Sequence, residues 1–168
     1  MTRQTLAELG EHGLISLMQG LLGASDYVLI GSGDDAAHIA TADGTYLVST
    51  DLLIEGHHFR RDWSSAEDIG RKAVAVNLSD INAMGGVATA LTVGLAAPGD
   101  TPVAWVQELF AGMVAECSAV GAQVVGGDVS AAETLIISIT ALGDAEKPVT
   151  RAGASAGDVV AYTGELGM

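Results

Sequence analysis

The chain has 168 residues, which is long enough for one well-buried domain, and its composition of 49% hydrophobic and 17% charged residues excludes a disordered acidic segment. Its 21 acidic and 7 basic residues give a net charge of -14, which would repel nucleic acid or an anionic membrane surface. A nucleotide is compatible with this charge only if cations screen its phosphates.

Cysteine usage and the N-terminal segment indicate a cytoplasmic protein. Cys117 is the only cysteine, so neither a disulfide framework nor a thiolate zinc site is available. Residues 1–10 contain no apolar core of signal-peptide length, and no uninterrupted apolar run reaches about 18 residues. We therefore expect a protein that is neither exported nor membrane-spanning.

The first third of the chain predicts one helix and two strands. Apolar residues at near-helical spacing predict an amphipathic helix over Leu6–Leu22, weakened by Gly10 and Gly13. Tyr27–Ile30 and Tyr46–Ile54 are rich in β-branched and aromatic residues, which is typical of strands.

The middle of the chain predicts a second helix and a strand. Ser64 and Glu67 have the spacing of a capping box, and the helix that follows ends at Gly85-Gly86. The periodicity of this helix places Asp80 on the same stripe as its apolar residues, hence on the buried side. Ala88–Ala96 reads as a strand.

The last third predicts a helix that begins near Pro102 and three strands. Apolar residues of this helix recur every three or four positions. Helices and strands mix without strict alternation, so we predict an α+β fold, a mixed or antiparallel sheet with helices packed on one face. The chain ends just past a predicted strand, so we expect residues 1–168 to form one domain that stops at a domain boundary. The three strands are Gln123–Val125, Thr134–Leu142 and Asp158–Thr163.

Aspartates beside glycine or small residues carry most of the functional information. No lysine or arginine adjoins any of them, although a carboxylate at the end of an apolar segment is costly to desolvate without a positive partner. A divalent cation would meet this need, and carboxylates with hydroxyl and backbone oxygens suit Mg²⁺. Taken singly, each aspartate could instead cap a helix or a turn. The segments are Gly33-Asp34-Asp35-Ala36, Ser49-Thr50-Asp51, Asn77-Leu78-Ser79-Asp80 and Gly126-Gly127-Asp128.

A dinucleotide-binding interpretation fits the glycine spacing of residues 31–36 and the position of Asp51. It fails because Asp34 and Asp35 would direct negative charge at a pyrophosphate, and because residues 36–43 are too short for a crossover helix. No Walker A lysine motif occurs in the chain.

Three further residues are candidates for contacts with anions. His57 and His58 follow a strand, and alternation would direct them to opposite sides, which argues against a zinc site built on both and favours one of them contacting a substrate phosphate. Arg151 suits phosphate oxygens, although a surface ion pair is its ordinary role.

At these residues the chain resembles the thiamine-monophosphate kinase family, in a superfamily that also holds aminoimidazole ribonucleotide synthetase, selenophosphate synthetase and a hydrogenase maturation protein. Ordered matches run over nearly the whole chain, and the His-Phe pair after Glu-Gly points to the thiamine kinases. The matching segments are residues 30–37 (IGSGDDAA), 49–59 (STDLLIEGHHF), 75–86 (AVNLSDINAMGG), 124–128 (VVGGD) and 150–154 (TRAGA).

The resemblance implies an enzyme that transfers the γ-phosphoryl group of ATP to thiamine monophosphate, without a protein nucleophile or base. It implies that His58 contacts the thiamine substrate and that Phe110, Gly127, Asp128 and Arg151 contact ATP. It also implies a cluster of magnesium ions on six residues, which are Asp35, Ser49, Thr50, Asp51, Asp80 and Asp128.

The resemblance further implies a fold like the N-terminal domain of aminoimidazole ribonucleotide synthetase, in a homodimer whose sheets pair in a barrel-like interface with ATP in a groove there. Family members carry a second α/β domain that supplies further contacts, so we expect this chain to be the N-terminal ATP- and magnesium-binding domain. Two alternatives stay open: another ATP-dependent enzyme of the superfamily, of the selenophosphate or aminoimidazole ribonucleotide synthetase type, and a noncatalytic nucleotide-binding dimerisation module. The selenophosphate type would need a reactive Cys or selenocysteine near the N-terminus, which the sequence lacks.

Overall fold

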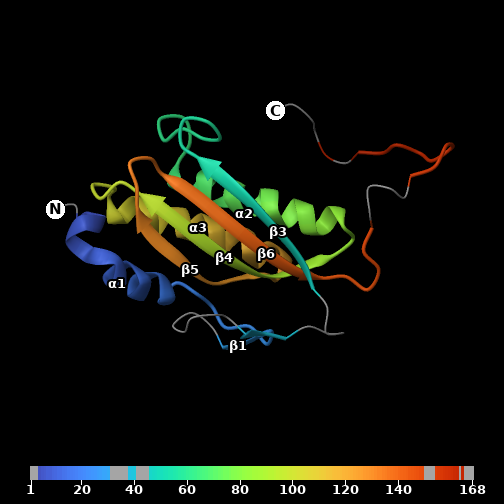
Figure 1. Cartoon of the computed structure of the whole chain (residues 1–168), viewed down its shortest axis with the longest axis horizontal. Helices are drawn as coiled ribbons and strands as arrows, with labels where there is room; N and C mark the ends of the chain where they lie inside the picture. Colours follow the sequence, from blue (N-terminus) through green and yellow to red (C-terminus); the bar gives the residue numbers. More distant parts are fainter. Residues whose placement is uncertain (1–3, 31–37, 41–45, 150–153, 163, 165–168) are drawn as a thin grey trace.

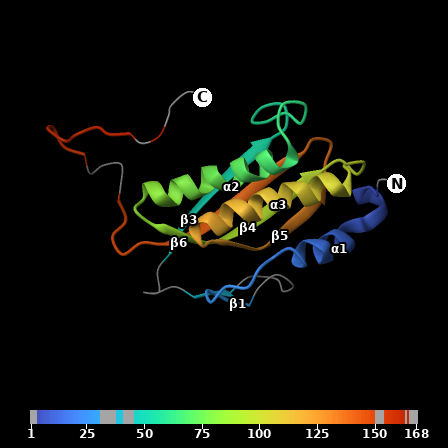
Figure 2. The same cartoon turned by 180° about the vertical axis from the view of Figure 1, so that it is seen from behind.

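A computed structural model describes residues 4–30, 38–40, 46–149, 154–162 and 164. One four-stranded mixed sheet forms the centre of the fold, with two long helices side by side across one of its faces (Figures 1 and 2). The predicted α+β class with helices on one face is confirmed.

The central sheet has the strand order β3-β6-β4-β5. β6 runs antiparallel to both β3 and β4, whereas β4 and β5 are parallel and are connected by a helix on the covered face. Helical crossovers connect β3 to β4 and β4 to β5, which keeps these three strands parallel, whereas the short connection from β5 to β6 passes β4 and reverses the strand direction, so a sheet of mixed direction results. Its strands are β3 (Leu47–Ile54), β4 (Val87–Ala97), β5 (Gln123–Ala131) and β6 (Ile136–Asp144).

The helices α2 (Ala66–Ala83) and α3 (Val103–Val120) cover the sheet, and α1 (Leu6–Gln19) lies against α3 and β5. A separate antiparallel pair is formed by β1 (Val28–Ile30) and β2 (His38–Ile39). At the centre of the sheet, the side chains that point toward α2 and α3 are apolar. Val93, Ile137 and Ile139 are examples, and their side chains are fully buried.

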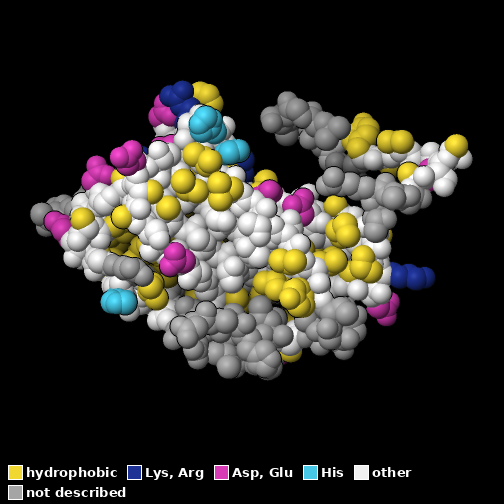
Figure 3. Space-filling model, viewed as in Figure 1, with side chains coloured by type: hydrophobic (Ala, Val, Ile, Leu, Met, Phe, Trp, Pro, Cys, Tyr) yellow, Lys and Arg dark blue, Asp and Glu magenta, His cyan; other side chains and the backbone are white. Residues whose placement is uncertain are grey.

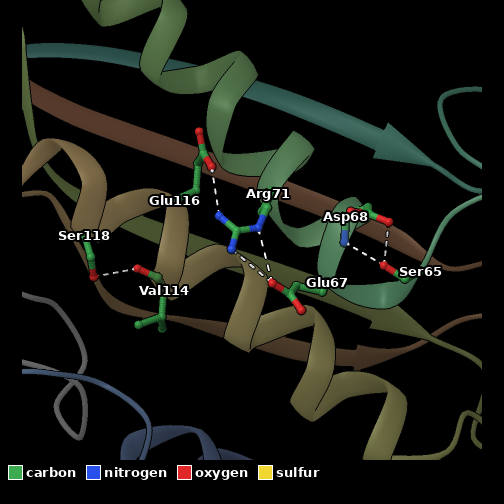
Figure 4. A network of polar contacts seen from close by, with 7 residues as sticks. All are labelled: Ser65, Glu67, Asp68, Arg71, Val114, Glu116 and Ser118. Atoms are coloured by element: carbon green, nitrogen blue, oxygen red, sulfur yellow. Dashed lines mark hydrogen bonds and ion pairs between the residues drawn. The ribbon is translucent and has the colours of Figure 1, made fainter.

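The backbones of α2 and α3 touch where the two helices cross. A β-carbon at Gly70 would overlap the carbonyl of Leu109, and one at Gly112 would overlap the carbonyl of Glu67. Arg71 reinforces the crossing, since its guanidinium pairs with Glu67 at 3.0 Å and with Glu116 of α3 at 3.5 Å (Figure 4). These exposed ion pairs add little to stability, so the close glycine packing is what holds the helix pair.

α3 is the one helix of the described chain that is long and apolar enough to cross a membrane by length and composition. Its apolar stripe packs against the sheet and α2, and Val106, Leu109, Phe110 and Met113 are fully buried. The composition of α3 is therefore that of a core helix.

Several predicted boundaries need correction. The N-cap of α2 is Ser65, whose hydroxyl accepts the Asp68 N–H at 3.1 Å, and not Ser64. Asp80 is an exposed residue, because the buried stripe of α2 runs through Asn77 and Ile81 instead. β5 continues through the Gly-Gly-Asp segment to Ala131, and the described residues 158–162 form no strand.

Burial of Cys117 generates a prediction about its reactivity. Its side chain is buried in the core, and burial raises the pKa of the thiol to about 12. At pH 8 roughly one thiol in ten thousand would then be ionised in the folded chain, against roughly a quarter in the unfolded chain. We expect a colorimetric disulfide reagent at pH 8 to label the native chain at least about a hundredfold more slowly than the chain in urea.

The sign of the pH effect follows from the raised pKa. As pH rises from about 9 towards 12 the unfolded chain loses this proton and the folded chain keeps it, so the free energy of unfolding should fall over that window. Because Cys117 is the only cysteine, one equivalent of rapid labelling under native conditions would contradict this prediction.

Candidate active site between β3 and α2

Three of the predicted metal ligands meet where α2 packs over β3, and we call Ser49, Asp51 and Asp80 the acidic site. Alternation along β3 turns Ser49 and Asp51 toward α2. The Ser49 hydroxyl donates to Asp80 Oδ2 at 2.7 Å, and the Asp51 backbone N–H donates to Asn77 Oδ1 at 3.0 Å. Both contacts join residues of β3 to the last turns of α2.

Asn77 positions this site, although its place in the sequence did not mark it as a functional residue. Its side chain is fully buried, and its Nδ2 donates to the Ala73 carbonyl at 2.9 Å while its Oδ1 holds β3. The signal that could have revealed it is the helical stripe, since a polar residue at a buried position needs hydrogen-bond partners.

The charge of the acidic site is not balanced by the residues around it. In the part of the chain that the structure describes, no lysine or arginine forms an ion pair with Asp51 or Asp80. Ser49 and Asp80 line a cavity of about 380 Å³. Hard oxygen donors beside an open cavity fit Mg²⁺, which keeps several waters and uses few protein ligands. The described residues include no cluster of three or more acidic, histidine or cysteine side chains, so these side chains alone make a partial site.

The structure does not bring the other predicted metal ligands to this place. The side chain of Thr50 points to the open face of the sheet, where its hydroxyl lies 2.8 Å from that of Thr140. Asp128 shares that open face through its register with Gly94, but it lies on β5, three strands from β3 and roughly 14 Å away at the usual strand spacing. Its carboxylate accepts from the Ser130 hydroxyl at 3.2 Å. Asp35 lies outside the described residues.

Two residues predicted to contact the nucleotide, Phe110 and Gly127, have roles in the packing of the fold. Phe110 has no exposed surface and belongs to the core, so it offers no face to a purine ring, and the predicted contact is corrected on this ground. A β-carbon at Gly127 would overlap the carbonyl of Val93, so glycine is needed there for the close approach of β4 and β5. Arg151 lies outside the described residues.

His58 lies in the turn after β3 and is held from two sides. Its Nδ1 accepts the Ile54 backbone N–H at 2.9 Å, and Lys72 of α2 donates to its carbonyl oxygen. Since Nδ1 is an acceptor, the neutral imidazole carries its proton on Nε2, which can donate to an anion or a polar ligand.

His57 and His58 do not alternate across a strand, because β3 ends at Ile54 and both residues are exposed in the turn. Their ring centroids are 6.4 Å apart, and no third histidine, cysteine or acidic side chain joins them among the described residues.

This fold, one mixed sheet with two helices across one face, matches that of AIR synthase-related proteins. The chain belongs to the family described as AIR synthase related protein, N-terminal domain, whose profile matches residues 33–145. Within it the chain is similar to the thiamine-monophosphate kinase of Mycobacterium tuberculosis, with 47% identity over 165 residues, 97% of this chain and 50% of the relative. The resemblance predicted from the sequence is confirmed, and the chain spans about half the length of the curated relatives it matches.

Solved structures agree with this assignment. Thiamine monophosphate kinase from Aquifex aeolicus superposes with a TM-score of 0.65 at 34% identity, covering 90% of this chain and 48% of that one. AaThiL complexed with AMPPCP and TMP also has a TM-score of 0.65, at 36% identity, and covers 92% of this chain and 48% of that one.

Removal of the Asn77 side chain should destabilise the fold. The substitution Asn77→Ala leaves the Asp51 N–H without its partner in a buried setting, so we expect the free energy of unfolding to fall by about 1–3 kcal/mol. Urea denaturation would measure the change, with Asn82→Ala as the control, because Asn82 is an exposed asparagine of the same helix. Equal effects of the two substitutions would contradict a positioning role for Asn77.

Proposed function

We propose that this chain supplies the ATP- and magnesium-binding domain, residues 1–168, of an enzyme that transfers the γ-phosphoryl group of ATP to thiamine monophosphate, giving thiamine diphosphate and ADP. The observation that carries the proposal is the acidic site, where Asp80 accepts from the Ser49 hydroxyl, Asp51 lies on the same side of β3, and no described lysine or arginine pairs with either carboxylate, in a chain of net charge -14. The identity with thiamine-monophosphate kinases along 97% of the chain and the AaThiL structure complexed with AMPPCP and TMP support it.

The residues of the acidic site would hold Mg²⁺ through Asp80, Ser49 and Asp51. A bound magnesium ion neutralises charge on phosphate oxygens, which is the main requirement of phosphoryl transfer. Asp35, Thr50 and Asp128 stay predicted ligands, and Gly127, Asp128 and Arg151 predicted ATP contacts. His58 would donate from Nε2 to thiamine monophosphate. We assign no nucleophile or general base, because positioning and charge neutralisation are sufficient for this chemistry.

Magnesium-dependent nucleotide binding tests this proposal. We expect calorimetric titration with AMPPCP to show binding in the presence of Mg²⁺ and none after chelation with EDTA. Asp80→Asn and Asp128→Asn should each weaken binding by tenfold or more, because each removes a charge that the cation needs. Asp100→Asn, which changes an exposed carboxylate in the loop after β4, should leave binding within about twofold. Equal affinity with and without Mg²⁺, or no binding by the unaltered chain, would refute the assignment.

We also propose a homodimer in which the open faces of two sheets meet. α2 and α3 cover only one face of the sheet (Figure 1), and apolar side chains are visible on the opposite side of the molecule (Figure 3). Val48 and Leu52 of β3 are exposed on this open face. Thr50 and Asp128 lie on this same face, so pairing would bring residues of one copy close to those of the other. Apolar surface on an otherwise strongly acidic chain favours such an interface.

Charge placed on the open face should separate the two copies. We expect Leu52→Asp to shift the chain from dimer to monomer in sedimentation velocity at micromolar concentration. Val120→Asp is a matched control, because Val120 is 48% exposed on α3 and Leu52 is 46% exposed on the sheet. A monomeric unaltered chain, or equal behaviour of both variants, would refute the interface.

Two other functions fit parts of the structure less well. A noncatalytic nucleotide-binding module would keep Mg²⁺-dependent AMPPCP binding without any turnover of thiamine monophosphate by the whole enzyme. Another synthetase of the superfamily would turn over a different acceptor. Use of ATP agrees with the cytoplasmic location that we expect, and cell fractionation would test it.

A further inference from the structure

The turn between β3 and α2 encloses a second cavity, of about 450 Å³, at the opposite end of the junction from Asp80. This turn projects beyond the sheet, and histidine, basic, acidic and apolar side chains gather on it (Figures 1 and 3). The side chains that matter for recognition are His57, His58, Arg60, Trp63, Asp68 and Lys72.

Trp63 is the unexpected member of this group, because its side chain is 76% exposed. Burial of an indole stabilises a fold, and an exposed indole does not contribute this stabilisation. Exposed tryptophans are therefore common at ligand or partner sites. Trp63 is also placed in a defined way, since the Arg60 guanidinium lies 4.5 Å from its ring centroid. Arg60 in turn makes two hydrogen bonds to Asp62, at 2.6 and 2.9 Å.

These contacts leave a face of the indole available. Arg60 covers one face, yet most of the ring surface is still accessible to solvent. Arg60 and Asp62 together carry no net charge, and the hydrogen bond from Arg60 lowers the pKa of the Asp62 carboxyl, which keeps the pair ionised. The pair therefore fixes the indole without repelling a cation on its other face.

The exposed indole face favours a flat, positively charged ring, while Lys72 and Asp68 contribute opposite charges to the wall and Arg60 is paired with Asp62. The face of an indole is negative in its quadrupole and attracts cations, and the wall includes the carboxylate of Asp68. An imidazole Nε2–H from His58 can donate to the polar part of the same ligand. We propose that Trp63 is a specificity residue that stacks on the cationic heteroaromatic ring of thiamine monophosphate, an inference that rests on the proposed function.

The position of the cavity agrees with a substrate that has a ring at one end and a phosphate at the other. α2 runs from this cavity back along β3 to the acidic site, and Lys72 and Asp80 are roughly 12 Å apart along the helix axis. The cavity that holds Trp63 and the cavity that holds Asp80 therefore lie at the two ends of one helix.

Binding titrations followed by tryptophan fluorescence test this inference. The chain has two tryptophans, and Trp105→Phe leaves Trp63 as the only reporter. It is also a matched control, because Trp105 has a similar contact with Arg61, at 5.8 Å, outside the cavity. We expect thiamine monophosphate to quench Trp63 in this variant with an unchanged Kd. Calorimetry should show a Kd about tenfold higher in Trp63→Leu and an intermediate value in Trp63→Phe.

A neutral probe separates charge recognition from simple packing. Thiochrome monophosphate carries an uncharged fused ring, so the unaltered chain should prefer thiamine monophosphate to it, and Trp63→Leu should lose this preference. An unchanged Kd in Trp63→Leu, a preference that survives the substitution, or no binding of thiamine monophosphate would each overturn the role of Trp63. Magnesium-dependent AMPPCP binding, measured on the same samples, shows whether the proposed function stands when the role of Trp63 fails.

Discussion

Direct backbone contact between α2 and α3 decides where everything else in this domain can lie. Gly70 and Gly112 have no side chains at the crossing, so the two helices approach until carbonyl groups of one meet α-carbons of the other. A side chain at either position would force the helices apart by overpacking. Held together in this way, the pair covers one face of four strands, with α2 over β3 and β6. One face of the sheet is therefore covered by helices, and the other is open to solvent. The C-terminal end of α2 lies over Ser49.

The acidic site follows from that placement. Because α2 is fixed over β3, Asp80 meets a serine hydroxyl, and the Asn77 side chain accepts a hydrogen bond from the Asp51 backbone N–H. Asp51 and Asp80 bring two negative charges to one junction, and among the described residues no lysine or arginine forms an ion pair with either. The hydroxyl of Ser49 provides one donor, which is weak compensation for two charges. A divalent ion is the simplest species that would remove this imbalance.

Much of the fold was predictable from the sequence, and the failures have particular physical causes. Apolar periodicity located α3 correctly, because a core helix shows a full stripe, although Val120 at its end is exposed and Phe110 proved to be buried. The N-cap of α2 was assigned one residue early because Ser64 and Ser65 both precede an acidic residue by three positions. Asp80 was assigned to the buried side because helical periodicity indicates the direction of the buried stripe but not which residues lie at its margin. Asp128 was placed after a strand because Gly-Gly-Asp is typical of a turn, whereas β5 uses Gly127 for close approach to β4 and continues.

Alternation predicts that neighbouring strand residues face opposite sides, but which side the helices cover, and the face on which Asp128 lies, follow only from the register of the folded sheet. Ser49 and Thr50 are neighbours in the chain, yet alternation sends one to α2 and the other to the open face. Asp51 and Asp128 likewise end on different faces, at opposite edges of the sheet. A magnesium cluster that used all six predicted ligands would therefore need oxygen atoms from both faces, or the backbone oxygens of β3, or a second copy whose β5 edge meets the first copy's β3. The open face is where a second copy could supply them, so the dimer and the metal site become a single structural question.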